Sequence, residues 1–572
     1  MRELKRTSQV ALLRERPVRV PKPTEWASGL LSAALLVSSF PDFDLWFLAW
    51  VAFIPILITT ARMKSAKRAF LLWWAIGALF FYGSCWWLTH AMIYYGDLPA
   101  WVAFPLLVPG ALILGLFPAA SGALLAWLCQ KLGRRALLLF PLLWATFEWA
   151  RFFVTGQLWN ALGYSQAYVP FLIQSARWGG VYAVGFLIAM TNSALALALA
   201  ERRRGAVSIC IVALLSVLTA IILSARYRRD VAFSAPTTLF IAVQPNVPAD
   251  FQRTLSETEI LLRRHVQLSL EGLRATLGSA TSSSSPSDAA SLSSEDQTRR
   301  ATSIDSSASR TTSPSSEDHT RRVVIWPESP MNFRYARDAS FREFIAEFAR
   351  ANRVFMLFNA MEPAPANGVY NSAILLDESG QLVAQYNKIK LLPFGEYIPL
   401  PKWLPGVSLI SAIVGDFTPG TRYTLMPIGD LRAGVFICFE SAFPTIAREF
   451  VRRGADLLVN ISNDGYLGET PVLHQHLANA IMRAVETGRP VLRVTNTGIS
   501  AWISPRGEVL DATPSFQADV RIWPVERASE EMTFYAAHGD LFVALCALIS
   551  LLSVARAADR LTLSRLPGRI KI

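Results

Sequence analysis

The sequence predicts two parts of different fold class, a polytopic α-helical membrane domain of about eight spans and an α/β domain outside the membrane. Two observations predict this division. Several apolar runs are long enough to cross a bilayer, and hydrophobic residues make up 52% of the chain against 17% charged residues. Between the seventh and eighth runs, short apolar segments alternate with helical patterns, which is typical of layered α/β domains.

The predicted spans follow the apolar runs, because a helix needs ~20 apolar residues to cross the hydrocarbon core of a bilayer. The runs lie at 26–40, 44–60, 69–90, 101–128, 136–155, 173–199, 206–224 and 538–555. The first of them is short for a span. We therefore expect a membrane domain of about seven helices over residues 26–225 and a C-terminal transmembrane helix over 538–556.

Basic residues predict the orientation of these spans. With eight spans, the main clusters of Lys and Arg all fall on one side of the membrane. These clusters include Arg14, Arg62, Arg134, Arg203 and Arg560. By the positive-inside rule, the N-terminal segment 1–25 and the tail 557–572 are cytoplasmic, and residues 226–537 lie outside the cytoplasm. Topology thus accounts for the net charge of +12, and we expect no nucleic-acid partner.

Two charged residues stand within the fifth apolar run and its flank, in "FEWARFFVTGQLWNALGYSQ". Glu148 and Arg151 are three residues apart and therefore share a helix face. Charges at membrane depth are costly, and they usually pair with each other or serve a function. Two interpretations stay open, a structural ion pair and the lining of a site through which lipid enters.

The region between the seventh and eighth runs is a series of short segments rich in apolar and β-branched residues. Examples are "RVVIWPES", "NSAILLD", "AGVFICFE" and "ADLLVNISN". Several are apolar throughout, as expected of strands that are covered on both faces. Helical patterns such as "SFREFIAEFARANR" and "LHQHLANAIMRAVETG" separate them. Residues 226–537 are therefore predicted to form an α/β layered domain.

One segment of this domain does not fit a packed core. Residues 277–320 consist mainly of Ser, Thr, Ala, Asp and Arg, and no aromatic residue occurs between Phe251 and Trp326. Such a segment buries too little apolar surface to offset the entropy of ordering it. We predict a disordered insertion that follows a helix near 254–275.

Three predicted strand ends carry the candidate catalytic residues. "VVIWPESP" ends in Glu328, "AQYNK" ends in Lys388, and "GVFICFE" carries Cys438. Each residue alone also has an ordinary explanation, since Glu328 could cap a helix, Lys388 could be a solvated charge, and a free cysteine is most often a small buried hydrophobe. Together they complement one another. A cation lowers the pKa of a thiol from about 8.5, and a carboxylate can accept the thiol proton.

The order and spacing of these residues resemble those of a known superfamily. Glu, Lys and Cys in "WPES", "YNKIKLLPFGEYIP" and "ICFE" are similar to the nitrilase superfamily of carbon–nitrogen hydrolases. Seven spans before that domain and one after it resemble the apolipoprotein N-acyltransferase family, and the resemblance covers nearly the whole chain. It implies an α-β-β-α sandwich, with Cys438 as nucleophile, Glu328 as general base and Lys388 stabilising an oxyanion. Glu396 and Glu440 match two further glutamates of that family.

The chain departs from the family pattern at three aromatic positions. Phe439 stands where the family usually has Tyr, Tyr466 stands where it usually has Trp, and only Phe251 follows "QPN" where a Trp is usual. These departures concern the choice of substrate. We also expect Arg489 to contact a lipid headgroup. His474 and His476 are two residues apart and do not share a helix face, so no metal site is predicted, and no cofactor is implied.

The resemblance also implies a reaction and a location. The acyl donor would be a membrane phospholipid, and the acceptor would be the N-terminal diacylglyceryl-cysteine of an apolipoprotein. The enzyme would be a multi-pass monomer in the bacterial inner membrane, with its catalytic domain on the periplasmic side. Two alternatives stay open, a membrane-tethered amidase acting on small molecules and a scaffold or transporter with an inactive nitrilase fold.

Overall fold

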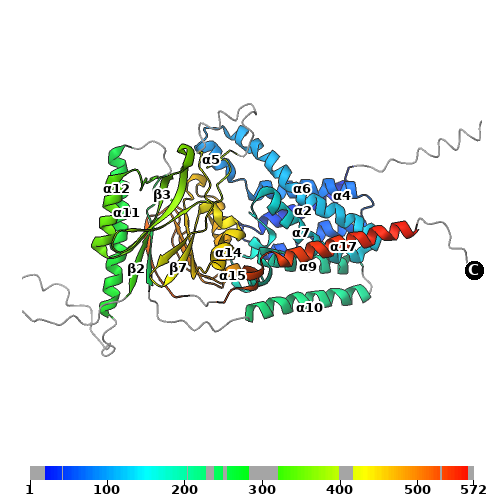
Figure 1. Cartoon of the computed structure of the whole chain (residues 1–572). Helices are drawn as coiled ribbons and strands as arrows, with labels where there is room; N and C mark the ends of the chain where they lie inside the picture. Colours follow the sequence, from blue (N-terminus) through cyan, green and yellow to red (C-terminus); the bar gives the residue numbers. More distant parts are fainter. Residues whose placement is uncertain are drawn as a thin grey trace, which may run out of the picture.

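The computed structural model describes residues 20–41, 43–201, 204–226, 238–248, 254–282, 320–398, 416–527 and 531–564. Within these residues, helices form one end of the molecule, and two β-sheets with their covering helices form the other (Figure 1). The C-terminal helix α17 returns to the helical end after the last strand, so both terminal parts of the chain contribute to the same bundle.

The helical part is assembled from both ends of the described chain. Its helices are α2 (Pro23–Ser38), η1 (Trp46–Trp50), α3 (Ile54–Arg62), α4 (Ala66–Ser84), α5 (Leu88–Tyr94), α6 (Ala100–Leu132), η2 (Arg134–Leu139), α7 (Phe140–Thr155), η3 (Leu162–Gln166), α8 (Pro170–Ile173), α9 (Ala176–Ala200), α10 (Arg204–Arg226), α16 (Phe534–His538) and α17 (Leu541–Ser564). Many of their large apolar side chains face outward, including Leu106, Ile113, Leu215 and Leu551, as expected of helices in lipid.

Five of the described helices are long and apolar enough to cross a membrane. They cover 100–132, 134–155, 176–200, 204–226 and 541–559. A sixth crossing is possible if α4 and α5, which bend by 55° at their junction, form one broken span. The predicted runs at 26–40 and 44–60 instead contain the 16-residue α2 and the shorter η1 and α3. The count of about eight spans therefore stays a prediction.

The second part contains two six-stranded sheets. Its strands are β1 (Thr238–Gln244), β2 (Arg321–Ile325), β3 (Phe355–Pro363), β4 (Val369–Leu376), β5 (Leu382–Asn387), β6 (Leu425–Ile428), β7 (Leu431–Ile437), β8 (Leu457–Ser462), β9 (Val491–Thr495), β10 (Ala501–Ile503), β11 (Val509–Ala512) and β12 (Asp519–Val525). The order is β12-β1-β2-β3-β4-β5 in one sheet and β11-β10-β9-β8-β7-β6 in the other. Strands β1–β3 and β7–β9 pair in parallel at the centres of the sheets.

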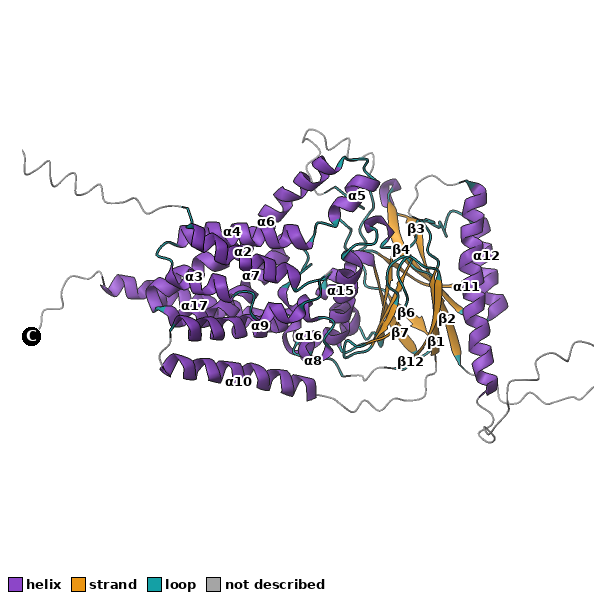
Figure 2. Cartoon of the chain, turned by 180° about the vertical axis from the view of Figure 1, so that it is seen from behind, coloured by secondary structure: helices purple, strands orange, loops and turns teal. Residues whose placement is uncertain are grey.

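Helices cover the outer face of each sheet, which gives the α-β-β-α layering that the resemblance implied. These helices are α11 (Leu255–Ser282), α12 (Ala339–Asn352), α14 (Pro444–Arg452) and α15 (Val472–Thr487), and short 3₁₀ turns η4 (Pro365–Asn367), η5 (Cys438–Ala442) and η6 (Gly465–Leu467) complete the domain. Helices α11 and α12 lie at the far end of the molecule, whereas α14 and α15 lie between the sheets and the helical bundle (Figures 1 and 2).

Local sequence signals account for several of these elements. The Asp338 side chain accepts a hydrogen bond from the backbone N–H of Phe341 and so caps α12. Gly488 ends α15 with a φ of 67°, a conformation that glycine adopts without strain. Helix α11 continues to Ser282, so the start of the predicted disordered segment 277–320 is helical. Residues 283–319 of that segment lie outside the described residues.

Candidate active site

Glu328 follows β2 and Lys388 follows β5, and the two side chains meet at one edge of the first sheet, although β3 and β4 lie between these strands. Lys388 follows β5, is 2% exposed, and donates a hydrogen bond from Nζ to Glu396 Oε1 at 2.9 Å. Its Nζ lies 3.5 Å from Glu328 Oε1. Glu396 also accepts a hydrogen bond from the backbone N–H of Leu392 at 2.7 Å. The ammonium group is therefore held between two carboxylates in a buried position.

The two carboxylates keep Lys388 charged. Burial lowers the pKa of the Lys388 ammonium, but Glu328 and Glu396 raise it by more, and the net pKa lies above its ordinary value. The Cys438 thiol is electrostatically coupled to both Lys388 and Glu328. The site thus contains a fixed positive charge whose electrostatic influence reaches the Cys438 thiol and would stabilise a thiolate there.

Cys438 stands where β7 ends and the 3₁₀ turn η5 begins. Its φ is 52°, in the left-handed region that costs a non-glycine residue ~1–3 kcal/mol. Burial and the Glu328 carboxylate raise the pKa of the thiol, whereas Lys388 lowers it, and the net pKa lies above the ordinary value. The thiol is therefore protonated at neutral pH and needs a general base before it can attack.

Glu440 braces this turn. Its side chain is fully buried, and Oε1 accepts hydrogen bonds from the backbone N–H of Ile389 at 2.8 Å and of Lys390 at 3.0 Å. Its Oε2 accepts from the backbone N–H of Ile437 at 2.8 Å. The Tyr386 hydroxyl donates to the same carboxylate at 2.8 Å. One carboxylate therefore connects the backbone beside Lys388 to the backbone beside Cys438.

Phe439 and Tyr466 face the helical part of the molecule. The ring of Phe439 stacks on that of Trp159 at a centroid distance of 5.8 Å and an interplanar angle of 23°. The ring of Tyr466 packs edge-on against Tyr95 at 5.3 Å. Two of the three aromatic departures from the family pattern thus lie where the hydrolase-like domain meets the helices, and the third, Phe251, lies outside the described residues.

Arg489 is 5% exposed and donates hydrogen bonds to backbone carbonyls. Its Nε donates to the carbonyl of Ala455 at 2.9 Å, and its NH1 donates to that of Glu531 at 3.2 Å. These contacts tie the loop after α15 to neighbouring loops. The prediction that Arg489 contacts a lipid headgroup stays a prediction.

The sequence analysis missed several polar residues that support the site. Asn371 on β4 donates from Nδ2 to both Glu328 Oε1, at 2.7 Å, and Glu396 Oε1, at 2.8 Å. The backbone N–H of Asn463 donates to Glu328 Oε2 at 3.1 Å. The signal for Asn371 was an asparagine in a mostly apolar strand, "VYNSAILL". A buried amide in such a strand needs partners of its own.

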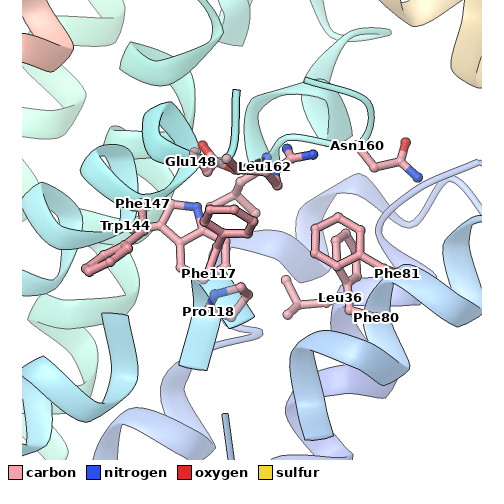
Figure 3. Close-up of a pocket in the computed structure, with 11 residues that line it drawn as sticks. Leu36, Phe80, Phe81, Phe117, Pro118, Trp144, Phe147, Glu148, Asn160 and Leu162 are labelled. Atoms are coloured by element: carbon pink, nitrogen blue, oxygen red, sulfur yellow. Dashed lines mark hydrogen bonds between the residues drawn. The ribbon is translucent and has the colours of Figure 1, made fainter. Parts of the chain in front are cut away.

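The pair Glu148 and Arg151 braces a loop of the helical part. The backbone N–H of Leu162 donates to Glu148 Oε1 at 2.7 Å, and Arg151 NH1 donates to the carbonyl of Trp159 at 3.0 Å. The adjoining cavity, lined by aromatic rings and by both charged side chains, has a volume of about 20 Å³ (Figure 3). That volume admits one water molecule but no acyl chain. The contacts favour a structural role over a lipid-access site.

Comparisons with known proteins match both parts of the chain. A model of the apolipoprotein N-acyltransferase N-terminal domain matches residues 32–194, and a model of the carbon–nitrogen hydrolase domain matches residues 307–533. An apolipoprotein N-acyltransferase of Geobacter metallireducens is 32% identical over 530 residues, which cover 91% of this chain and 93% of the relative. The chain belongs to the apolipoprotein N-acyltransferase family. A relative of the same name from Bradyrhizobium diazoefficiens is 30% identical and covers 92% of this chain and 94% of its own.

Apolipoprotein N-acyltransferases are enzymes with a carbon–nitrogen hydrolase domain, and this chain is an enzyme of that type. Its apolar helices fit a membrane protein. Among solved structures, an amidase from Nesterenkonia sp. is 17% identical, covers 39% of this chain and 81% of its own, and has a TM-score of 0.29. A carbon–nitrogen hydrolase from Helicobacter pylori is 18% identical, covers 35% and 75%, and has a TM-score of 0.28.

Proposed function

We propose that this enzyme transfers a fatty acyl chain from a membrane phospholipid to the N-terminal diacylglyceryl-cysteine of an apolipoprotein, with Cys438 carrying the acyl chain between the two. The observation that carries the proposal is the grouping of the partly buried Glu328 and Cys438 with the buried Lys388, beside a face that is covered by apolar helices. Family membership supplies the general acyltransferase activity.

In the first step, Glu328 accepts the Cys438 proton as the sulfur attacks the ester carbonyl of the phospholipid. A new S–C bond forms, and the carbonyl electrons move to oxygen, where Lys388 and backbone N–H groups stabilise the oxyanion. When the oxyanion collapses, the C–O bond of the ester breaks. The lysophospholipid leaves with the proton that Glu328 returns, and Cys438 carries a thioester.

In the second step, the α-amino group of the acceptor attacks the thioester. An α-amino group has a pKa of about 8, so part of it is neutral at pH 7 and able to attack. Glu328 accepts the proton that the amine loses as the C–N bond of the amide forms. The C–S bond of the thioester breaks, and the departing Cys438 sulfur takes the proton back from Glu328. Both substrates are anchored in lipid, so a site held at the membrane surface binds them in an orientation that a free domain would not provide.

The other residues have supporting roles in this proposal. Glu396 holds Lys388, and Glu440 fixes the backbone on both sides of the site. Phe439 and Tyr466 contact the helical part, where the acyl chains would enter, and Arg489 would bind a headgroup. The protein would be a monomer of the inner membrane, with 226–537 on the periplasmic side and both termini in the cytoplasm.

Mass spectrometry of the purified protein after incubation with phospholipid tests this proposal. We expect one added acyl chain, on Cys438, that hydroxylamine removes and that a Cys438→Ser variant does not acquire. Active protein without an acyl adduct would contradict the thioester step. Release of ammonia from small amides without formation of lysophospholipid would instead support a membrane-tethered amidase.

A further inference from the structure

Helix α15 is the element that joins the candidate active site to the helical part of the molecule. It lies between the second sheet and the bundle (Figure 2), and each of its residues except His474 is buried. Gln475 and His476 are adjacent on α15, and each is 3% exposed. Their side chains extend toward different parts of the molecule. Gln475 contacts the helical part, and His476 contacts the nucleophile.

Both the oxygen and the NH₂ group of the Gln475 amide form hydrogen bonds with groups of the helical part. Its Oε1 accepts three hydrogen bonds, from Trp87 Nε1 at 3.0 Å, Trp159 Nε1 at 2.9 Å and Asn160 Nδ2 at 3.3 Å. Its Nε2 donates to the backbone carbonyls of Pro41 at 3.1 Å and Ser84 at 2.9 Å. A flipped amide would place its NH₂ against three donors and its oxygen against two acceptors, so a single orientation is allowed.

His476 holds the backbone of the nucleophile. Its Nε2 donates to the carbonyl oxygen of Cys438 at 3.0 Å, and its Nδ1 lies 2.9 Å from Asp464 Oδ1. Asp464 is fixed in turn by Arg493 NH2, which donates to Oδ2 at 2.7 Å. The carbonyl that His476 binds belongs to the residue with the strained φ of 52°, so this hydrogen bond fixes the turn that aims the thiol.

Trp159 provides a second connection between the same two places. Besides donating to Gln475, its ring stacks on Phe439, the residue after the nucleophile, and lies 5.6 Å from the ring of His476. Displacing α15 from the bundle would therefore disturb Phe439, which follows Cys438 in the chain, and His476, which binds the Cys438 carbonyl, at the same time.

We propose that Gln475 and His476 are positioning residues, which make the geometry and hence the reactivity of the Cys438 thiol depend on the seating of α15 against the helical part. The proposal extends the proposed function, because it assigns the membrane helices a part in aligning the nucleophile as well as in holding lipid. Its test measures the reactivity of the thiol directly. If wild-type protein acquires no acyl chain from phospholipid, the proposed function fails. The alkylation rate of Cys438 can still be compared between variants, so it decides the positioning proposal separately.

The test compares Gln475→Leu with a matched control in the full-length protein. Gln174 also reaches across to the hydrolase-like domain, where its Nε2 donates to the carbonyl of Arg506 at 2.8 Å, but that loop does not include the nucleophile. We expect Gln475→Leu to slow alkylation of Cys438 by iodoacetamide about ten- to a hundredfold, because a small displacement misaligns the reacting group. Gln174→Leu should leave this rate unchanged. The rate is followed by mass spectrometry of the peptide that contains Cys438.

A pair of His476 variants separates positioning from a purely structural role. His476→Gln retains an N–H donor near the Cys438 carbonyl, whereas His476→Leu does not, so the Gln variant should recover part of the alkylation rate. Should Gln475→Leu fail to fold, Trp87→Phe removes a single donor to Gln475 and should slow alkylation moderately. Equal rates for the Gln475 and Gln174 variants, or for the two His476 variants, would overturn the proposal.

Discussion

The two outer helical layers of the sandwich have opposite surroundings. Helix α12 buries Phe341, Ile345 and Phe348 against its sheet, and its opposite face is exposed. Helix α15 carries polar residues on its outward face too, but there they are buried against the bundle. An amphipathic pattern therefore determines which face of a helix packs on its sheet. Whether the polar face is exposed or buried depends on which other part of the chain packs against it.

The ion pairs on these helices show what this difference means energetically. On α12, Arg350 lies 3.0 Å from Glu343, and both side chains are largely exposed. On α15, Arg483 Nε lies 2.8 Å from Glu486 Oε2, and both are fully buried. Exposed pairs contribute little to stability, whereas breaking a buried pair leaves a charge without compensation.

The largest predicted effect follows from this contrast. Arg483→Met should destabilise the protein by about 3–5 kcal/mol, because Glu486 would remain buried without its partner. The variant also loses hydrogen bonds to the Tyr164 hydroxyl and the Ser441 carbonyl. Arg350→Met should cost less than about 0.5 kcal/mol. The apparent unfolding temperature of each purified variant in detergent measures the difference.

A double variant sharpens that prediction. Replacing Glu486 by Leu in the Arg483→Met background removes the stranded charge, so it should recover part of the lost stability. The backbone N–H of Val181, which donates to Glu486 Oε1 at 2.9 Å, would lose its acceptor, so recovery should be incomplete. If the double variant is less stable than Arg483→Met, the buried charge is not the main cause of the loss.

Lys388 and Lys390 allow the same comparison within one short segment, because Lys388 is buried and Lys390, two residues later, is exposed. Lys388→Met should lower the fraction of Cys438 thiolate ~10- to 1000-fold, because it removes the cation that lowers the thiol pKa. Lys390 is exposed and serves as the matched control, so Lys390→Met should leave the rate unchanged. Alkylation by iodoacetamide at fixed pH measures both, and similar losses in the two variants would contradict the role of Lys388.

The pH dependence of the same reaction tests the electrostatics of the buried site. The pKa of Cys438 is raised, so the thiol is protonated at neutral pH and its thiolate fraction grows as pH increases. We expect the alkylation rate of wild-type protein to keep rising from about pH 6 to about pH 10, beyond the point where an ordinary thiol levels off. A plateau near neutral pH would show a depressed pKa instead.

The smallest predicted effect concerns the aromatic contact on the bundle side. Phe439→Leu loses the stacking on Trp159 and should cost about 0.5–1.5 kcal/mol, whereas Phe439→Tyr retains the ring and should be neutral in stability. If residue 439 selects substrates, Phe439→Tyr should change the preference among phospholipid donors in a transfer assay. An unchanged preference would remove Phe439 from the residues that determine specificity.

Much of the candidate site could be predicted from the sequence. Glu328, Lys388 and Cys438 stand at the ends of apolar strands in a chemically complementary set, and the structure places their groups close enough to interact. Asn371 shows the limit. An asparagine in a mostly apolar strand signals a buried amide, but it does not say that its N–H groups meet the carboxylates of Glu328 and Glu396.

The sequence by itself determined the division into an apolar helical part and an α/β domain, because hydrophobic periodicity and length are local properties. It did not decide where the polar face of α15 would lie. In "LHQHLANAIMRAVETG", Gln475, His476 and Arg483 read as ordinary polar residues of an amphipathic helix. Only the tertiary structure brings Gln475 into contact with Trp87 and Trp159. These partners are 388 and 316 residues away in the chain, and they reach Gln475 only when the helical bundle packs against the sandwich.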